Sequence, residues 1–296
     1  MDLDTLIIAV FCLVDDTLSQ LFGNQRLRER GPRPRLADAE VLTIEIVGEY
    51  LGLDRERALL DYFCRHWSHY FPQLMTVHRT TFTRQAANLW KVKERLWQQL
   101  LERSGGDPSW AIVDSFPVAV CRFARAPRCR TFRGAAGFGK DQTIRQVFYG
   151  FRLHVRVCWP GVITRFAVCG AQVPDLAVLE ELTDETTGSC LADRNYWRPE
   201  LHERLSERGL QMLVPFKKRR YDPEPRRSHR ISSIRYRIET VFSQLTERFS
   251  IKRVWARDIW HLSSRLLRKV LAHTVGVLLN RAEGNEPLRL AQLLAH

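Results

Sequence analysis

The strongest constraint on the fold is a break in the hydrophobic pattern at Ser104–Pro108 (SGGDP). Glycine and proline at this density interrupt regular secondary structure, so the segment predicts a linker. Before it, apolar residues recur at the three- and four-residue spacing of helices, and after it short β-branched and aromatic runs predict strands. We therefore expect an all-helical domain over 1–104, a second domain over 109–281 and a C-terminal tail over 282–296.

Five short apolar runs follow the linker, and each has the composition of a buried strand. They are interleaved with stretches that predict helices. This order is typical of a mixed α/β (α+β) fold in which a mixed five-stranded sheet is flanked by helices. The expected strands cover Trp110–Val113, Gln146–Val157, Val162–Cys169, Cys190–Ala192 and Leu210–Val214.

The chain is strongly basic, with 46 Lys and Arg against 33 Asp and Glu and a net charge of +13 in 296 residues. This excess suggests a polyanionic partner, either nucleic acid or an anionic membrane. The charge is clustered, because Arg122–Arg156 holds nine basic residues and one acid, and Lys217–Arg237 holds nine and two. Such patches bind phosphates strongly and largely without sequence preference. A solvated charged loop is the alternative.

The N-terminal apolar run Leu6–Val14 has nine residues and is closed by Asp15 and Asp16. A spanning helix needs about 20 residues, so we interpret the run as a helix that faces the core and expect no membrane span. The seven cysteines are an odd number in a long chain and argue against a disulfide framework. We therefore expect a cytoplasmic protein.

Three acids stand where catalytic carboxylates would be useful. Asp114 ends the first expected strand, Asp193 ends the fourth, and Glu239 lies on a helix beside an apolar stripe. Open α/β sheets bind ligands beyond the carboxyl ends of their strands. A few carboxylates there suffice for two Mg²⁺ ions that promote an in-line displacement at phosphorus. For each acid alone, an ordinary solvated position is the alternative.

Four motifs carry a resemblance to a known family. They are Ile112–Pro117 (IVDSFP), Phe148–His154 (FYGFRLH), Leu191–Tyr196 (LADRNY) and Arg235–Phe242 (RYRIETVF). Together they resemble the DDE transposases of bacterial insertion sequences, most closely the insertion-sequence 982 family, and the resemblance covers nearly the whole chain.

The resemblance implies an RNase H-like catalytic core in which Asp114, Asp193 and Glu239 are the catalytic residues and the ligands of two divalent ions, Mg²⁺ or Mn²⁺. It implies DNA cleavage at transposon ends and strand transfer into target DNA, with no small-molecule cofactor. The implied partner is double-stranded DNA, as terminal inverted repeats and as target, bound by a homodimer in the nucleoid of a bacterial cytoplasm. A metal nuclease without strand transfer and a catalytically inactive DNA-binding protein remain alternatives.

Three positions depart from the pattern of the family and its relatives. Asn195 stands where glycine is usual, and since asparagine tolerates a left-handed backbone we expect the turn to be kept. On the last motif, Ser232 and Thr246 replace a tyrosine and a lysine, whereas Arg235 is kept. We expect Arg235 to hold a phosphate or to pair with Glu239, one turn further along the helix.

The candidate DNA-binding residues lie in several segments of the chain. A glycine-containing segment over 134–139 is expected to be a flexible loop that becomes ordered on DNA. Val77–Leu89 is interpreted either as a recognition helix or as part of a helical dimerisation or packing domain. The candidate residues are Lys217, Lys218, Arg219, Arg220, Arg235, Arg152, Arg133, Lys140, Arg79 and Arg84.

Overall fold

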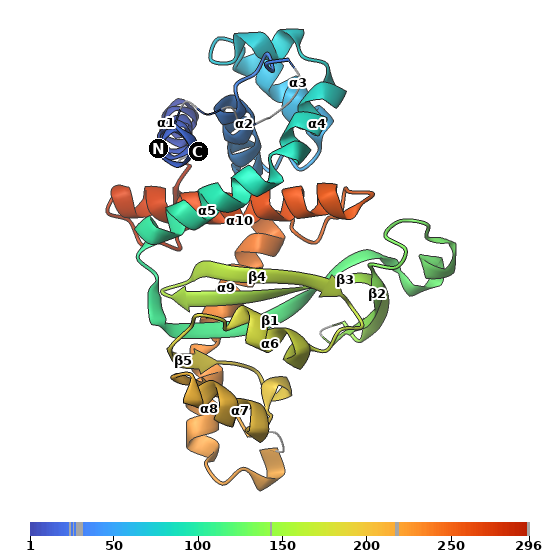
Figure 1. The fold of residues 1–296 in the computed structure, drawn as a ribbon, viewed down its shortest axis with the longest axis vertical. Coiled ribbons are helices and arrows are strands. Elements are labelled where there is room, and N and C mark those ends of the chain that lie inside the picture. The colour runs from blue at the N-terminus through green and yellow to red at the C-terminus, as the bar shows by residue number, and fades with distance from the viewer. Residues whose placement is uncertain (24, 26, 28–31, 143, 217–218, 295–296) are drawn as a thin grey trace. The chain divides into compact units, whose positions relative to one another are not determined.

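The computed structural model of the chain describes residues 1–23, 25, 27, 32–142, 144–216 and 219–294. The chain divides into two compact units, one helical and one built on a sheet (Figure 1). The helical unit consists of Met1–Ser104, Gln244–Ile251 and Trp255–His296, and the sheet unit consists of Gly105–Ser243 and Lys252–Val254.

The boundary after Ser104 falls in the expected linker. The C-terminal part of the chain differs from the expected division into a domain over 109–281 and a tail over 282–296. Nearly all residues after Ser243 join the N-terminal helices. The physical reason is that the last long helix is buried along most of its length and packs among those helices.

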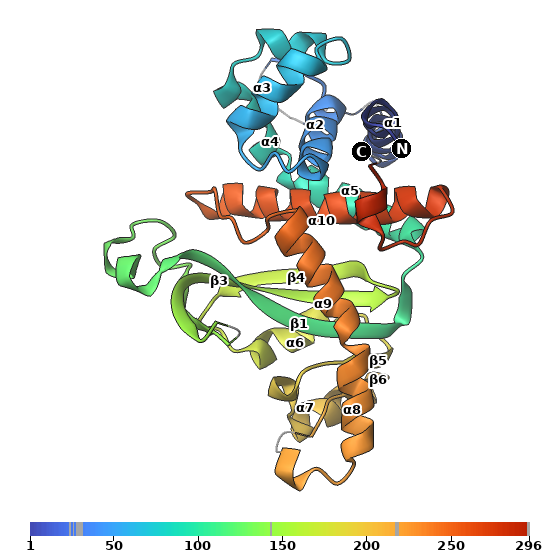
Figure 2. The same cartoon turned by 180° about the vertical axis from the view of Figure 1, so that it is seen from behind.

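That helix, α10 (Ile259–Ala282), is the centre of the helical unit. The side chain of Asp258 caps its first turn by accepting the His261 backbone N–H. It contacts α5, α2 and α4 (Figure 2). The other elements of the unit are α1 (Leu3–Phe22), α2 (Asp38–Tyr50), α3 (Glu56–His66), α4 (Arg79–Asn88), α5 (Trp90–Ser104) and the short helices η1 (Pro72–Thr76), η5 (Gln244–Arg248) and η6 (Leu290–Gln292).

Helix α1 is longer than the apolar run Leu6–Val14 indicated, because the two aspartates after Val14 do not end it. It has 20 residues and a hydropathy of 1.7, so by length and composition it is the one helix among the described residues that could cross a membrane. In the helical unit its buried residues include Leu6, Val10 and Val14, which form one stripe at helical spacing. The helix packs against α2 and α5, as a core helix does.

The sheet unit contains one mixed sheet of six strands. Strand β1 is antiparallel to β3, which is antiparallel to β4, whereas β5 is parallel to β1 and β6 is parallel to β5. These five strands correspond to the expected ones, but the expected end of the first strand at Asp114 is wrong, because β1 pairs with β3 as far as Arg122. The strands are β1 (Asp107–Arg122), β2 (Gly137–Asp141), β3 (Gln146–Trp159), β4 (Val162–Gly170), β5 (Gly188–Leu191) and β6 (Leu210–Leu213).

The sixth strand, β2, corrects the expectation of a flexible loop over 134–139. It pairs antiparallel with the first residues of β3, on the edge of β3 that β4 uses further along. Glycine is needed here because the neighbouring backbone comes very close. A Cβ at Gly139 would stand 2.7 Å from the Cβ and 3.0 Å from the carbonyl oxygen of Ala171.

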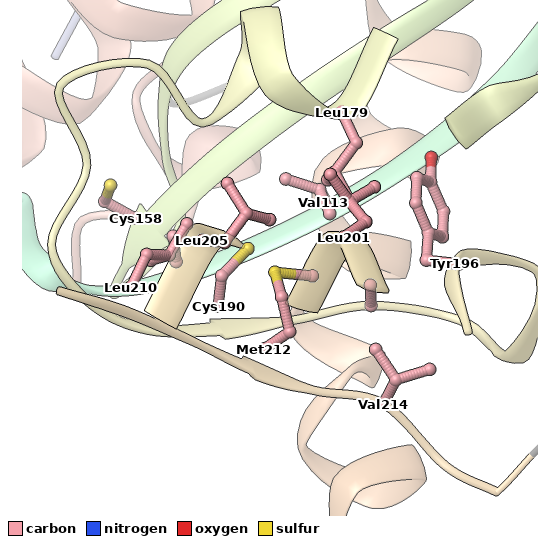
Figure 3. Close-up of a cluster of buried hydrophobic side chains, with 12 residues drawn as sticks. Val113, Cys158, Leu179, Cys190, Tyr196, Leu201, Leu205, Leu210, Met212 and Val214 are labelled. Atoms are coloured by element: carbon pink, nitrogen blue, oxygen red, sulfur yellow. The ribbon is translucent and has the colours of Figure 1, made fainter. Parts of the chain in front are cut away.

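Helices cover both faces of the sheet. Figures 1 and 2 show α6 (Asp175–Leu182) and α7 (Pro199–Glu207) on one face and α8 (Pro225–Ile234) and α9 (Tyr236–Ser243) on the other. The core under α6 and α7 contains Val113 of β1 (Figure 3). Because side chains alternate along a strand, the residues on either side of Val113 point to the opposite face. Asp114 therefore faces the side of the sheet that α8 and α9 cover.

Candidate functional site

The pairing of β1 with β5 brings two of the three predicted acids to one place. The strands are parallel, and Ile112 of β1 lies opposite Leu191 of β5. Asp114 and Asp193 each follow two residues after this pair. Asp193 lies just beyond the carboxyl end of β5, whereas β1 continues past Asp114 to Arg122. Their meeting therefore results from strand register, although 79 residues separate them in the sequence.

The guanidinium of Arg235 lies between these two carboxylates. Its Nη2 donates to Oδ2 of Asp114 at 2.5 Å, and its Nη1 lies 3.8 Å from Oδ1 of Asp193. The other oxygen of Asp114 accepts the backbone N–H of Ser115 at 2.8 Å. Arg235 thus pairs with the two aspartates and not with Glu239, which corrects one of the two roles expected for it.

Burial is the main influence on the carboxyl group of Asp114. It raises the pKa of Asp114, and the negative charge of Asp193 acts in the same direction. Arg235 and the Ser115 N–H oppose this rise in the pKa. A nearby cation therefore stabilises the charged form of this partly desolvated carboxylate.

Asp193 is held by the short helix that follows it, η3 (Arg194–Tyr196). Its Oδ1 accepts the Arg194 backbone N–H at 2.5 Å, and its Oδ2 lies 3.4 Å from Nδ2 of Asn195. Asn195 lies within this short helix and has no positive φ, so the left-handed turn expected at this position is not formed. Its amide instead orients the carboxylate beside it.

Glu239 is exposed in the first turn of α9. One turn before it, Arg235 contacts Asp114, and three residues after it, Phe242 packs on Phe116 of β1 with ring centroids 4.7 Å apart. Residues at these spacings share one side of a helix. Glu239 is therefore on the side of α9 that faces the surface of the sheet on which Asp114 lies.

The convergence predicted for the three acids is present only in part. Asp114 and Asp193 are brought together, but among the described residues no three His, Cys, Asp or Glu side chains are gathered closely enough to hold a metal ion. The two aspartates nevertheless fit a divalent cation by their chemistry. They are hard oxygen donors, they already share one positive group, and one of them is desolvated.

Arg152 and His154 lie on the opposite face of the sheet, where they meet Asp175 at the start of α6. The Asp175 carboxylate accepts the Ser115 hydroxyl at 2.9 Å and lies 3.7 Å from Nδ1 of His154 and 3.8 Å from Nε of Arg152. Burial lowers the pKa of His154 to about 4, so its ring is neutral near pH 7. Sequence reasoning missed Asp175, for which the only signal was an acid in the first turn of a helix.

The other predicted DNA-binding residues are spread over both units. Lys217 and Lys218 lie outside the described residues, and of Arg219 only the backbone, in η4 (Arg219–Tyr221), is described. The remaining candidates are solvent-exposed: Arg220, Arg133, Lys140, Arg79 and Arg84. Arg152 is the exception, because it donates to the Ser115 hydroxyl and the Lys140 carbonyl.

Two of three comparisons with known proteins found a match, one to a family and one to a fold. A family model described as a transposase DDE domain matches residues 105–259. The fold is similar to that of the piggyBac transposase in a cryo-EM synaptic complex with hairpin DNA, with a TM-score of 0.52 and 10% sequence identity. That similarity covers 99% of this chain and 79% of the other, and at this identity it bears on the fold alone. No curated protein matches the chain significantly.

Proposed function

This chain belongs to the family of transposases with a DDE domain, and from that premise we propose that it cuts DNA at transposon ends and joins them to target DNA with divalent ions. The main support is the pair Asp114 and Asp193. Each stands two residues after the paired residues Ile112 and Leu191 of parallel β1 and β5, and both contact the Arg235 guanidinium. Such a pair of hard oxygen donors suits Mg²⁺ or Mn²⁺.

In this proposal each residue of the site has a separate task. Asp114 and Asp193 would hold two divalent ions, with Glu239 as a further ligand. Such ions would supply activation of the attacking oxygen and stabilisation of the leaving one. Arg235 releases the carboxylates, and its planar fork of donors then suits a phosphate beside the reacting one.

Two displacements at phosphorus follow from this arrangement. Water attacks the phosphate at the end of the element and breaks its bond to the 3′ oxygen of the element, which leaves a 3′-hydroxyl on the element and a 5′-phosphate on the flanking DNA. That hydroxyl then attacks a phosphate of the target strand, forms a new phosphodiester bond and displaces the 3′ oxygen of the target as a hydroxyl. Both are in-line reactions at a phosphodiester, so one set of carboxylates serves both.

The partner we propose is double-stranded DNA, as the ends of the element and as target. The net charge of +13 and the exposed Arg220 and Lys140 in the sheet unit support it. Arg79 and Arg84, exposed on α4, support a second DNA contact by the helical unit. A homodimer, two metal ions and a place among the bacterial insertion-sequence 982 transposases, acting in the cytoplasm, belong to the same proposal.

The test is a cleavage and joining assay on DNA that carries the chain's own coding sequence with both flanks, supplied intact or with pre-cut ends. We expect Mg²⁺ or Mn²⁺ to support both reactions and a chelator to abolish them. Asp114→Asn, Asp193→Asn and Glu239→Gln should each reduce both rates by at least a hundredfold. Glu207→Gln, an exposed acid at the end of α7, is the matched control and should leave both rates unchanged.

The two alternative functions give different results in the same assay. A metal nuclease without strand transfer cuts the intact DNA but yields no joined product from pre-cut ends. An inactive DNA-binding protein yields neither product, and its DNA affinity is indifferent to all three substitutions. Either result contradicts the proposed function.

A further inference from the structure

A cavity of about 460 Å³ lies in the sheet unit on the same side of the sheet as the two aspartates. Its walls are mainly apolar and come from the start of β1, the turn between β3 and β4, the end of β5 and the helices α8 and α9. The lining residues used below are Trp110, Ile112, Trp159, Leu191, Ile234 and Arg237.

Two partly exposed tryptophans supply the aromatic surfaces of this cavity. Trp110 is 48% exposed and Trp159 is 46% exposed, so neither indole is used to fill the core. The Arg237 guanidinium lies over the Trp159 ring, 4.9 Å from its centroid. Arg237 is the one basic residue lining the cavity in the described part of the chain. Asp107 also lines the cavity, and its carboxylate accepts the backbone N–H and the hydroxyl of Ser109. The cavity therefore offers aromatic surfaces, one cation and one carboxylate that is already hydrogen-bonded.

The cavity adjoins the acids along three separate elements. Trp110, Ile112 and Asp114 alternate along one face of β1, and Leu191 and Asp193 are related in the same way on β5. On the helical side, Ile234 and Arg237 flank the arginine that binds both aspartates. The four residue steps from Trp110 to Asp114 span about 13 Å, or about four nucleotides of one B-form strand.

We infer that this cavity takes an unpaired nucleobase from the DNA strand whose phosphate reaches Asp114 and Asp193. The base would stack on the exposed indoles, and Arg237 would pair with the phosphate of the same nucleotide. Stacking on aromatic side chains accepts any base because every base has a π face. The inference rests on the proposed function for the presence of DNA, but it assigns a binding site that the chemistry of cleavage does not need.

A nucleobase fits the cavity better than an apolar side chain from a second copy of the chain. DNA brings phosphates that pair with the Arg237 guanidinium, whereas an apolar side chain would leave this cation without an anion. Ile112 and Leu191 line the cavity, and each stands two residues before one of the aspartates, so a strand bound at the aspartates lies within reach of the cavity.

The test compares two single-stranded 12-mers that have the same phosphates, one of thymidine and one of abasic nucleotides. We expect the full chain to bind the thymidine 12-mer about tenfold more tightly, because only the base can stack. Trp159→Ala should bring this ratio close to one, and Trp159→Phe should retain most of it. Trp255→Ala is the matched control, because Trp255 is 45% exposed but belongs to the helical unit, and it should leave the ratio unchanged.

Three results would overturn the inference. One is a ratio close to one for the unsubstituted chain. Another is an unchanged ratio in both Trp110→Ala and Trp159→Ala, with unfolding curves that show both variants to be folded. The third is that Trp110→Ala or Trp159→Ala changes self-association on sedimentation without changing the ratio of the two affinities. That result would assign the cavity to a second copy of the chain. Asp114→Asn separates this inference from the proposed function, because it should abolish cleavage and leave the ratio intact.

Discussion

Arg235 is the residue that makes the acidic pair possible in the folded chain. Asp114 lies within β1 and Asp193 lies just beyond the end of the neighbouring β5, and the negative charge of Asp193 contributes to the raised pKa of Asp114. The guanidinium supplies the opposite charge, at 2.5 Å from one carboxylate and 3.8 Å from the other. A divalent ion would do the same, so Arg235 and the proposed metal ions compete for the same oxygens.

This competition predicts the behaviour of Arg235→Gln. Without metal, the variant should lose about 1–3 kcal/mol of unfolding free energy, because it leaves two carboxylates without their cation. Saturating Mg²⁺ should then raise the melting temperature more in the variant than in the unsubstituted chain, because the ion no longer displaces a guanidinium. Thermal unfolding with and without Mg²⁺ measures both effects. Arg220→Gln, an exposed arginine in the same unit, should show neither, and equal Mg²⁺ shifts in all three proteins would refute the competition.

At the scale of the element, α10 carries an unusual number of buried polar groups. Arg268 pairs with Glu49, Lys269 lies 2.7 Å from Glu49, and Lys93 of α5 lies 2.6 Å from Glu45 of α2. All of these side chains are almost fully buried within the helical unit. Buried pairs of this kind are costly to break, so they fix which helices α10 contacts.

His273 of α10 predicts an acid sensitivity of the helical unit. Burial lowers the pKa of His273 to about 4, while its unfolded value is about 6.5. The unfolded chain therefore binds the proton first, and stability that is complete above pH 6.5 should fall by up to about 3 kcal/mol as the pH drops to 4. His273→Gln should reduce this slope in urea unfolding between pH 4 and 7, and the part that remains is expected from His154, whose pKa burial also lowers to about 4. His229→Gln, at an exposed position, should retain the slope, and a slope retained in both variants would rule out His273 as its source.

Gly150 of β3 predicts a second effect at the element scale. The pairing of β1 with β3 is irregular between Ala119 and Cys121, and this brings the β1 backbone against Gly150. A Cβ there would lie 2.5 Å from the Val118 carbonyl oxygen and 2.7 Å from the Val120 nitrogen. Gly150→Ala should therefore cost about 1–3 kcal/mol of stability in chemical unfolding. Gly106→Ala, whose nearest neighbour is a side-chain atom at 3.3 Å, should cost clearly less, and equal costs would count against this explanation.

At the scale of the whole molecule, the net charge of +13 predicts DNA binding that weakens steeply with salt. Lys140→Gln and Arg220→Gln should each lower the slope of log affinity against log salt by about 1, because each removes one phosphate contact. Filter binding from 50 to 200 mM salt measures the slope. Glu207→Gln is the control, and slopes that do not respond to either basic substitution would show that these residues do not contact phosphate.

The sequence predicted those features that depend on local pattern. The apolar runs before Asp114 and Asp193, and the change from helical to strand spacing after Ser104, were sufficient to predict five strands and the meeting of two acids. The end of the first strand was placed wrongly, because β1 continues past Asp114 to Arg122. Contacts between residues that are distant in the sequence could not be predicted from local pattern. The pairing of Arg235 with both aspartates depends on strand register, and the strand at Gly137–Asp141 depends on close approach to a neighbouring backbone. Likewise, the grouping of α10 with the N-terminal helices depends on packing that no local pattern records.

The most direct test of the central claim is a crystal structure of the chain grown with Mn²⁺, read by anomalous scattering. The account predicts a manganese peak about 2.1 Å from a carboxylate oxygen of both Asp114 and Asp193. It also predicts that Glu239 turns toward this peak and that the Arg235 guanidinium leaves the two aspartates. A map with no manganese at these carboxylates, and with Arg235 still bound between them, would contradict the account.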